Sequence, residues 1–332
     1  MDNKKRSAFT NNPIVKAIGT QKIVVVLVLI ALFMFFCAMS PNFRKYSTIL
    51  SILDYSYYVT FMAIGVTFCL ITGGVDLSIG TGMICSGLVG GYLINNMGMP
   101  VIVGVFAALA VGLVLGIING SLVAILNIPP FIATLGTMMV ARGFGSIATK
   151  SSSQTWPAAG TENGWVRAIF KTNIGDLKIP LGFLWVIILV VIMSIILNKT
   201  QIGRYIIAIG SNKEATRLSG VNVVKYQMSA YIISGLFTGL AGIAYASTFQ
   251  AVAPGSGAGL ELDAIGGAII GGTSMNGGMG SVVGSLLGVF IMSMLKTGLP
   301  YIGLQANWQQ IITCIVLIVA VFIDVQKNKK VN

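Results

Sequence analysis

The sequence has no histidine and few charged residues. Without histidine, there can be no histidine metal site, Ser-His catalytic pair or histidine proton relay. A P-loop of the form G-x-x-x-x-G-K-[ST] is also missing. Only 9% of the 332 residues are charged, whereas a soluble domain carries about 25%. The sequence therefore gives little support to a catalytic function, and the chain has no P-loop nucleotide site of its own.

Apolar residues and glycine dominate instead. Hydrophobic residues make up 55% of the chain, and there are 41 glycines, which are commoner in membrane helices than in soluble ones. A membrane span needs about 20 apolar residues. The sequence therefore predicts an all-α polytopic membrane protein. Its runs without Asp, Glu, Lys or Arg are 23–43, 55–75, 77–141, 179–198, 226–260, 264–295 and 297–323.

We expect about ten transmembrane helices within a permease domain over 23–326, flanked by tails at 1–22 and 327–332. The first apolar run is longer than a usual signal-peptide core, so it is predicted to be an uncleaved span. The eighth predicted span is short and is expected to be broken or re-entrant. The predicted spans are 23–40, 50–72, 77–95, 101–126, 131–149, 181–197, 227–249, 261–274, 281–299 and 308–324.

The placement of the cations predicts the topology. Of the 21 Lys and Arg, 13 lie in three segments: the N-terminal tail, 199–225 and the C-terminal tail. The positive-inside rule assigns these three segments to the cytoplasm. Six spans before 199–225 and four after it satisfy this pattern. The segment 150–180 is then extracytoplasmic, although its four Lys and Arg against Glu162 and Asp176 favour the opposite side slightly. This distribution explains the net charge of +12 without a nucleic-acid partner.

Cysteine, tryptophan and glycine patterns have ordinary structural explanations. The four cysteines lie in apolar runs without C-x-x-C spacing, which is typical of packed residues. The tryptophans lie near span ends, as interfacial anchors do, although Trp156 or Trp165 could also stack on a sugar. The glycine-rich segments 71–82 and 270–281 resemble each other, which indicates either an internal repeat near a pathway or close helix packing.

Three carboxylates and one cation border glycine-rich apolar runs. Asp76, Glu261 and Asp263 either cap the helices that follow them or line a translocation pathway. Arg142 is the single charge within its predicted span, so it needs a partner or water unless the span boundary is misplaced. The polar residues Ser78, Thr273 and Asn276 of the glycine-rich segments are further pathway candidates.

The polar stretch "SNKEATRLSG" predicts a short capped helix. Ser211 and Glu214 have the spacing of a capping box, and Gly220 follows Ser219 as a helix stop. The predicted helix has two turns and an apolar face formed by Ala215, Leu218 and Val221. Such a short helix is unstable alone in water, so a partner or lipid headgroups must cover this face. The predicted docking residues are Ser211, Asn212, Lys213, Glu214, Ala215, Thr216, Arg217, Leu218, Ser219 and Gly220.

These residues also carry a family resemblance. "GRYIIAIGSNKEATRLSGVNV" resembles the cytoplasmic coupling segment of bacterial ABC sugar-importer permeases of the ribose, galactoside and xylose branch. "LITGGVDLSIG", "PPFIATLGTMMVARG", "ELDAIGGAIIGGTSMNGGMGSVVG" and "LPYIGLQANWQQII" match the same family in its order. The resemblance covers nearly the whole chain and implies a ten-span permease of the bacterial inner (plasma) membrane.

The resemblance further implies the partners of the chain. These are a second permease copy, a cytoplasmic ATPase and an extracytoplasmic sugar-binding protein. The ATPase is expected to carry two ATP-binding-cassette domains in one double-cassette chain. ATP and Mg²⁺ would bind to the ATPase, with no cofactor in this chain, and residues 212–220 would insert into a groove on that ATPase. The alternatives are an ion-coupled secondary transporter with Asp76 and Asp263 as relay groups, and a channel or membrane scaffold.

Overall fold

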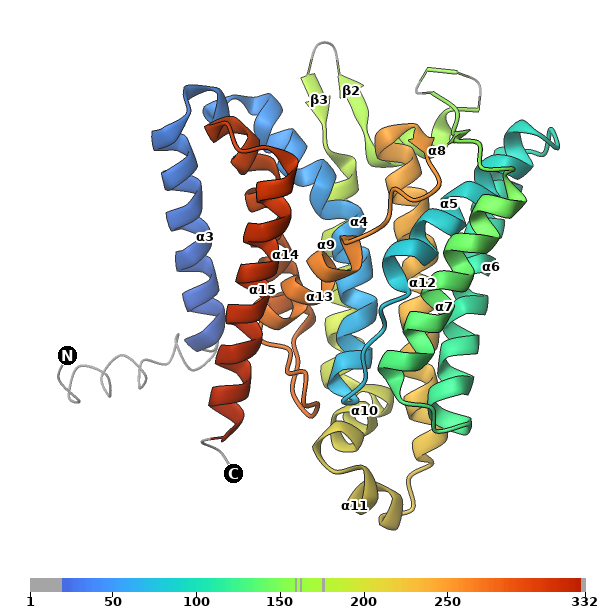
Figure 1. Cartoon of the computed structure of the whole chain (residues 1–332), viewed down its shortest axis with the longest axis vertical. Coiled ribbons are helices and arrows are strands. Elements are labelled where there is room, and N and C mark those ends of the chain that lie inside the picture. Colours follow the sequence, from blue (N-terminus) through green and yellow to red (C-terminus); the bar gives the residue numbers. More distant parts are fainter. Residues whose placement is uncertain (1–19, 159, 162, 175–176, 330–332) are drawn as a thin grey trace.

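The computed structural model describes residues 20–158, 160–161, 163–174 and 177–329, which form a bundle of roughly parallel and antiparallel helices (Figure 1). All ten predicted spans appear as helices, with ends shifted by a few residues. Eight helices of the described part are long and apolar enough to cross a membrane, whereas α5 and α13 are shorter. The ten helices are α3 (Thr20–Met39), α4 (Tyr46–Ile71), α5 (Ile79–Asn95), α6 (Val101–Gly120), α7 (Pro130–Ala148), α9 (Leu181–Lys199), α12 (Val223–Phe249), α13 (Leu260–Ile270), α14 (Val282–Gly298) and α15 (Ala306–Lys329).

Smaller elements cover the two ends of the bundle. At one end, here called the α8 end, lie the helix α8 (Trp165–Phe170) and two antiparallel ribbons (Figure 1). At the opposite end, the α11 end, lie α10 (Gln201–Ser211) and α11 (Lys213–Leu218). The ribbons pair β1 (Gln154–Thr155) with β4 (Ala251–Val252) and β2 (Thr172–Ile174) with β3 (Leu177–Ile179), and single helical turns occupy Pro41–Arg44, Ser121–Ile125 and Leu299–Ile302.

The charge pattern agrees with this arrangement. The first turn of α3, the last turn of α15 and the pair α10–α11 lie at the same end of the bundle (Figure 1). The helix ends that adjoin the three basic segments thus share one side, and α8 lies on the other. That the α11 end faces the cytoplasm remains a prediction, and Glu162, Asp176 and most of the two terminal tails lie outside the described residues.

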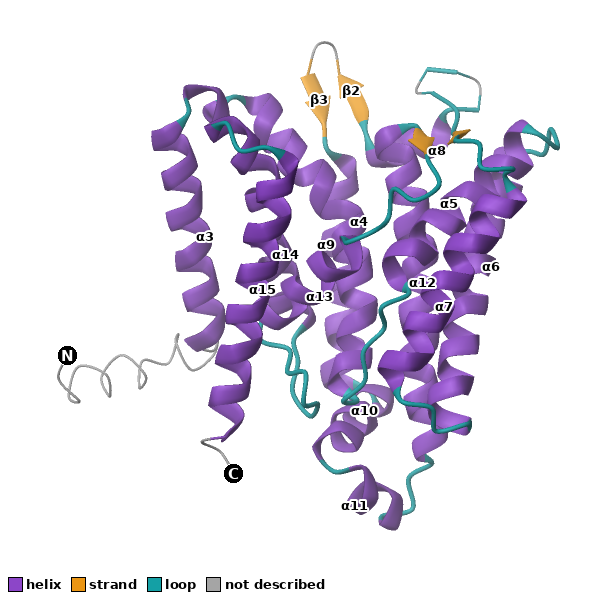
Figure 2. Ribbon diagram, in the orientation of Figure 1, coloured by secondary structure: helices purple, strands orange, loops and turns teal. Residues whose placement is uncertain are grey.

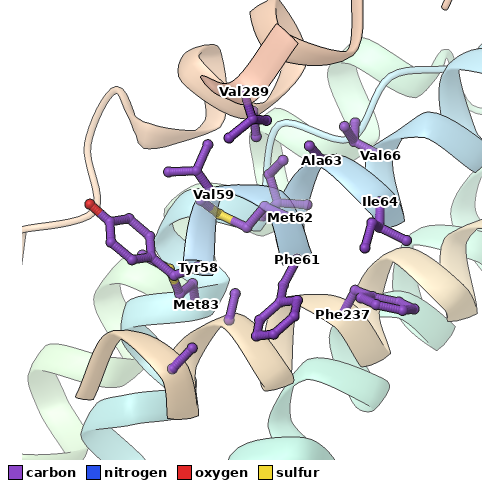
Figure 3. Close-up of a cluster of buried hydrophobic side chains, with 14 of the residues drawn as sticks. Tyr58, Val59, Phe61, Met62, Ala63, Ile64, Val66, Met83, Phe237 and Val289 are labelled. Carbon is purple, nitrogen blue, oxygen red and sulfur yellow. The ribbon is translucent and has the colours of Figure 1, made fainter. Parts of the chain in front are cut away.

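Helix α4 forms the centre of the bundle. Every residue from Ser56 to Ile71 is buried. Its side chains point in several directions and meet Met83 of α5, Phe237 of α12 and Val289 of α14 (Figure 3). A helix that is apolar on all sides is expected in such a position.

Helices α6 and α12 touch through glycine. A Cβ atom at Gly116 would lie 2.5 Å from the carbonyl oxygen of Tyr231, and one at Gly112 would lie 2.5 Å from the amide nitrogen of Gly239. Gly235 faces Gly112 and Gly116 at the same close range. These residues have the small-xxx-small spacing that allows membrane helices to pack backbone against backbone. In α6 and α12, glycine therefore serves close packing of the two helices.

Two spans are broken, and they run in opposite directions. The segment 72–78 leads from the α11 end into the bundle before α5 begins, and the segment 250–259 leads inwards from the α8 end before α13 begins (Figure 2). Helix α13 has 11 residues and is only about 16 Å long, roughly half of a hydrocarbon core. The eighth predicted span is therefore a short helix, as expected.

This arrangement gives the internal repeat a different alignment from the predicted one. The structural counterpart of 72–78 is 250–259, because each follows a long buried helix and precedes a short one. The segment 270–281 instead follows α13. Inverted pairs of broken helices of this kind are typical of transporter folds.

The glycine contact between α6 and α12 can be tested by substitution. Gly235→Leu should lower the free energy of unfolding by about 1–3 kcal/mol, because an added side chain overpacks the interface. Gly136→Leu is the matched control, since a Cβ at Gly136 meets nothing within 4 Å. Thermal unfolding of the purified protein in detergent measures both. Equal midpoints for the two variants would contradict the glycine contact.

Candidate functional site

The short helix α11 is capped differently from the prediction. Ser211 is the last residue of α10, and its hydroxyl donates to the carbonyl oxygen of Ile207. Asn212 is the N-cap, with an extended backbone, and its side-chain oxygen accepts a hydrogen bond of 2.9 Å from the amide of Ala215. Glu214 forms an exposed ion pair with Arg217 instead of reaching back. The capping box is therefore wrong, because α10 holds Ser211 in a helical turn and asparagine is an equally good cap.

The end of α11 and its exposed face agree with the prediction. Gly220 has a φ of +81° and follows the C-cap Ser219. The side chain of Leu218 is 79% exposed, and Ala215 is also exposed. Thr216 alone of the helix is buried, and Lys213, Glu214 and Arg217 are exposed. The structure thus presents a short helix with an uncovered leucine.

Helix α10 attaches α11 to the bundle and was missed by the sequence reasoning. The side-chain oxygen of Thr200 caps it, and Ile206 and Ile209 are buried on one face. The rings of Tyr205 and Tyr226 meet at a centroid distance of 4.7 Å, which ties α10 to the first turn of α12. The spacing of the isoleucines after a threonine cap was the available signal.

Gly210 of α10 brings both glycine-rich segments together. A Cβ atom at Gly210 would overlap the carbonyl oxygen of Ile71, the last residue of α4, and would lie close to the amide of Gly278. That amide donates a hydrogen bond of 2.9 Å to the same oxygen. Gly277, with a φ of +86°, packs against Gly210 and Gly73. We call Ile71, Gly73, Gly210, Gly277 and Gly278 the glycine junction.

Asp76 is the centre of a buried hydrogen-bond network. Its Oδ1 accepts from the amide and hydroxyl of Ser78, at 3.0 and 2.6 Å, and from Asn119 Nδ2 at 3.3 Å. Its Oδ2 accepts from the hydroxyl of Ser234 at 2.7 Å. Thr137 donates to Asn119 at 2.6 Å. The carboxylate binds the amide before α5 as a cap would, and it also connects α5, α6, α7 and α12.

Glu261 and Asp263 lie in the first turn of α13, as predicted, but their surroundings differ. Asp263 accepts a hydrogen bond of 2.5 Å from Tyr55 and lies 3.4 Å from the ammonium of Lys296. Glu261 accepts through Oε1 from the amide of Gly259 at 3.1 Å, while its Oε2 is buried without a hydrogen-bond partner.

Arg142 lies on α7 and is half-buried, and its Nε is enclosed without a partner. Arg142 lines a small space together with Thr81 of α5 and Gly257, which precedes α13. It lies within the helix, as predicted, because α7 continues to Ala148. Its depth in the membrane stays a prediction.

The remaining pathway candidates lie in the loop 271–281. Thr273 is buried and accepts from the amide of Ser281 at 3.4 Å, whereas the amide of Asn276 donates to the hydroxyl of Ser274 at 3.2 Å. The structure places this loop at the glycine junction and separates it from Glu261 by the length of α13 (Figure 2).

Sequence reasoning missed several partners in these networks. Tyr55, Asn119 and Ser234 carry no charge and stand in apolar runs, so nothing distinguished them. Lys296 offered a signal, because it is the only ionisable residue between the runs 264–295 and 297–323. In the described part of the chain, no three His, Cys, Asp or Glu side chains converge as metal ligands do.

Trp156 is neither an interfacial anchor nor freely available for a sugar. It is buried, its Nε1 donates to the carbonyl oxygen of Gly87 at 3.0 Å, and its ring lies against Gly90 and Gly91 of α5. Trp156 thus packs the ribbon of β1 and β4 against the α8 end of α5. Trp165 and Trp185 are exposed near helix ends, as anchors are.

Comparison with known proteins identifies the family of this bundle. The family described as the permease component of branched-chain amino acid transport systems matches residues 48–321. The chain belongs to this family. It is a multi-pass membrane protein and a transport component, not an enzyme.

Curated relatives of the permease align over almost their full length. It is 36% identical to the ribose import permease protein of Escherichia coli strain K12, covering 93% of this chain and 94% of the relative. It is 34% identical to the galactose/methyl galactoside import permease protein of Haemophilus influenzae, covering 91% and 94%. It is also 34% identical to the fructose import permease protein of Rhizobium meliloti, covering 91% and 83%.

The Asp76 network leads to a prediction that separates structure from transport. The two carboxylate oxygens of Asp76 accept four hydrogen bonds, and Asp76→Asn replaces one of these oxygens by an NH2 group that can only donate. The substitution should therefore lower the free energy of unfolding by about 1–3 kcal/mol. Transport per folded molecule should be retained. Thermal unfolding and uptake measure the two effects, and Glu214→Gln on the exposed ion pair is the control for thermal unfolding. Lost transport at unchanged stability would instead place Asp76 in the pathway.

Proposed function

We propose that the chain is the membrane permease subunit of an ATP-driven ABC importer for a monosaccharide. The relatives support this proposal, because all three are import permeases for a sugar. Their identities of 34–36% do not favour one sugar, so the proposal names the class of ribose, galactose or methyl galactoside, fructose and xylose. Nothing in these comparisons favours an ion-coupled transporter.

The observation that carries the proposal is the uncovered helix α11. A helix of six residues is unstable in water without tertiary contacts, and Leu218 exposes 79% of its surface. The helix is too short to be a good interfacial anchor. A groove on a cytoplasmic ATPase is the partner that fits a capped helix with one apolar side chain and flanking charges.

The glycine junction supports a route for the energy. The ATPase would bind ATP and Mg²⁺, and closure of its cassettes would move α11 and α10 together. Gly210 contacts the end of α4 and the loop 271–281 without any intervening side chain. Segment 72–78 leads from this junction to α5, and segment 271–281 joins it to α13 and α14. Movement of α10 would therefore act on both broken spans and switch access between the two sides.

The proposed assembly contains several further partners. We infer a homodimer of permeases, a double-cassette ATPase at the α11 end, and an extracytoplasmic sugar-binding protein at the α8 end. The bundle would lie in lipid of the bacterial inner membrane, with both termini in the cytoplasm. The apolar outward faces of α3, α7, α9 and α15 support a lipid and permease environment. Substrate selection would lie mainly with the binding protein.

Reconstitution in liposomes tests the function as a whole. Permease, ATPase and binding protein together should accumulate labelled D-ribose, D-galactose or D-fructose only with ATP inside the vesicle. Accumulation by the permease alone, driven by an imposed proton or sodium gradient, would contradict the proposal.

Docking through Leu218 can be tested directly. Leu218→Asp places a charge on the uncovered apolar side chain and should weaken ATPase binding by about tenfold or more, since a buried unpaired charge is costly. Co-purification and ATP-driven uptake measure the loss. Ser219→Ala, in the same exposed segment, is the control. Normal uptake by Leu218→Asp would show that α11 is not the docking element.

The role of the glycine junction in energy transfer gives a separate prediction. Gly210→Ala forces α10 away from Ile71, so uptake should fall about fivefold or more, while the ATPase still co-purifies because α11 is unchanged. Gly143→Ala is the control, since a Cβ there meets nothing within 4 Å. Loss of ATPase binding together with uptake would indicate a general folding defect and contradict this role.

A further inference from the structure

The beginnings of the two short helices meet inside the bundle. A Cβ atom at Gly80, in the first turn of α5, would overlap Oε2 of Glu261 in the first turn of α13. A Cβ at Gly257 would lie 2.5 Å from the carbonyl oxygen of Gly80. We call Gly80, Gly257 and Glu261, together with the neighbouring Arg142, the helix-start junction. Helix amino termini are partly positive, so both short helices stabilise the Glu261 carboxylate.

Two polar atoms of this junction have no protein partner. Glu261 is nine-tenths buried, and its Oε2 points at the first turn of α5 without accepting a hydrogen bond. Arg142 Nε is enclosed and donates to nothing. Buried polar groups are normally satisfied, so each unsatisfied one needs an explanation. The carboxylate is an acceptor and the guanidinium is a donor, so a ligand that joins them must be able to donate and accept.

A small cavity lies beside Arg142. It has a volume of about 10 Å³, which is the space of one water molecule. Its lining includes Thr81, Cys85, Arg142, Gly255 and Gly257. A sugar cannot enter a space of this size, so the junction is closed in this structure.

The elements around the cavity can separate. Arg142 belongs to α7, which packs mainly on α5 and α6 and exposes Phe144 and Ile147. The segment 250–259 has little regular structure and contains Gly255 and Gly259 at positive φ. Segments with few regular backbone hydrogen bonds are those that move at low cost in free energy.

We propose that the helix-start junction is the point where the translocation pathway binds the sugar, with Glu261 accepting from, and Arg142 donating to, its hydroxyl groups. A junction that holds both an anionic and a cationic side chain disfavours a net anion or cation, whereas sugar hydroxyls both donate and accept. The inference rests on the proposed function, to which it adds the position and chemistry of the contact.

The native cysteines provide a test without knowledge of the sugar. Cys85 lines the cavity, whereas Cys69 is buried in α4 away from it. One variant keeps Cys85 and carries Cys37→Ser, Cys69→Ala and Cys314→Ser; the matched control keeps Cys69 and carries Cys85→Ala instead. Both are reconstituted with the ATPase and binding protein and treated with a small charged methanethiosulfonate.

The expected result is a modification rate at Cys85 that rises about tenfold or more during ATP turnover, because a minor open state becomes populated. Cys69 should stay unreactive. If Cys85 remains unreactive while the vesicles accumulate sugar, the pathway does not pass through the junction. That outcome leaves the proposed function intact, since uptake is measured in the same vesicles.

A second measurement tests the hydrogen bonds. Uptake of the transported sugar is compared with uptake of its monodeoxy analogues, with the same binding protein throughout; for D-ribose the first analogue is 2-deoxy-D-ribose. The wild-type complex should discriminate against at least one analogue in its maximal rate, and Glu261→Gln or Arg142→Gln should reduce that discrimination about tenfold. Asp76→Asn is the matched control, because both oxygens of Asp76 already accept hydrogen bonds from the protein.

A purely structural role of Glu261 would give another pattern. The Glu261→Gln protein would then unfold at lower temperature but keep the wild-type ratio between sugar and analogue. That result would overturn the proposal, as would a wild-type complex that moves all analogues at equal maximal rates.

Discussion

Peptide groups inside a membrane must find hydrogen-bond partners within the protein, and the two broken spans make this constraint demanding. The segments 72–78 and 250–259 leave the helical hydrogen-bond pattern inside the bundle. Such backbone is stable only where protein surrounds it. Gly74 of the first segment lies against Tyr231 of α12, and Gly257 of the second lies against Gly80 of α5. The amide of Gly74 donates a hydrogen bond to the carbonyl oxygen of Cys69, and the amide of Trp156 donates one to the carbonyl oxygen of Gln250. Backbone groups at the start of both segments therefore have hydrogen-bond partners within the protein.

The same constraint connects the two ends of the permease. Glycine contacts occur both at Gly210, where α10 meets the bundle, and at Gly80, where the short helices start. The segment 72–78 begins at the first of these contacts and leads to the second, so it links the α11 end with the interior over one short element. Backbone contacts without side chains leave no rotamers to absorb a displacement. This geometry supports the proposed route for the energy.

The three buried carboxylates show how environment assigns different roles to similar residues. Asp76 has both oxygens satisfied by neutral donors, from Ser78, Asn119 and Ser234. Asp263 binds a tyrosine and a lysine through Oδ2, while its Oδ1 is buried without a hydrogen-bond partner. Glu261 accepts only from the amide of Gly259, and its buried Oε2 lies against the first turn of α5. From the sequence, all three were equally good caps or pathway residues. Only the neighbours contributed by distant helices separate them.

The sequence by itself determined the class of the protein, the ten helices and the short helix α11 with its stop at Gly220, because these depend on apolar length, charge placement and local capping. The family motifs were also visible in it. The tertiary structure decided that Asn212 is the cap, since α10 continues through Ser211. It also decided that 250–259, and not 270–281, is the counterpart of 72–78, because repeats of broken helices are matched by direction in space. The position of Glu261 against Gly80, and that of Arg142 beside Gly257, depend on contacts between residues far apart in the chain, which no local pattern encodes.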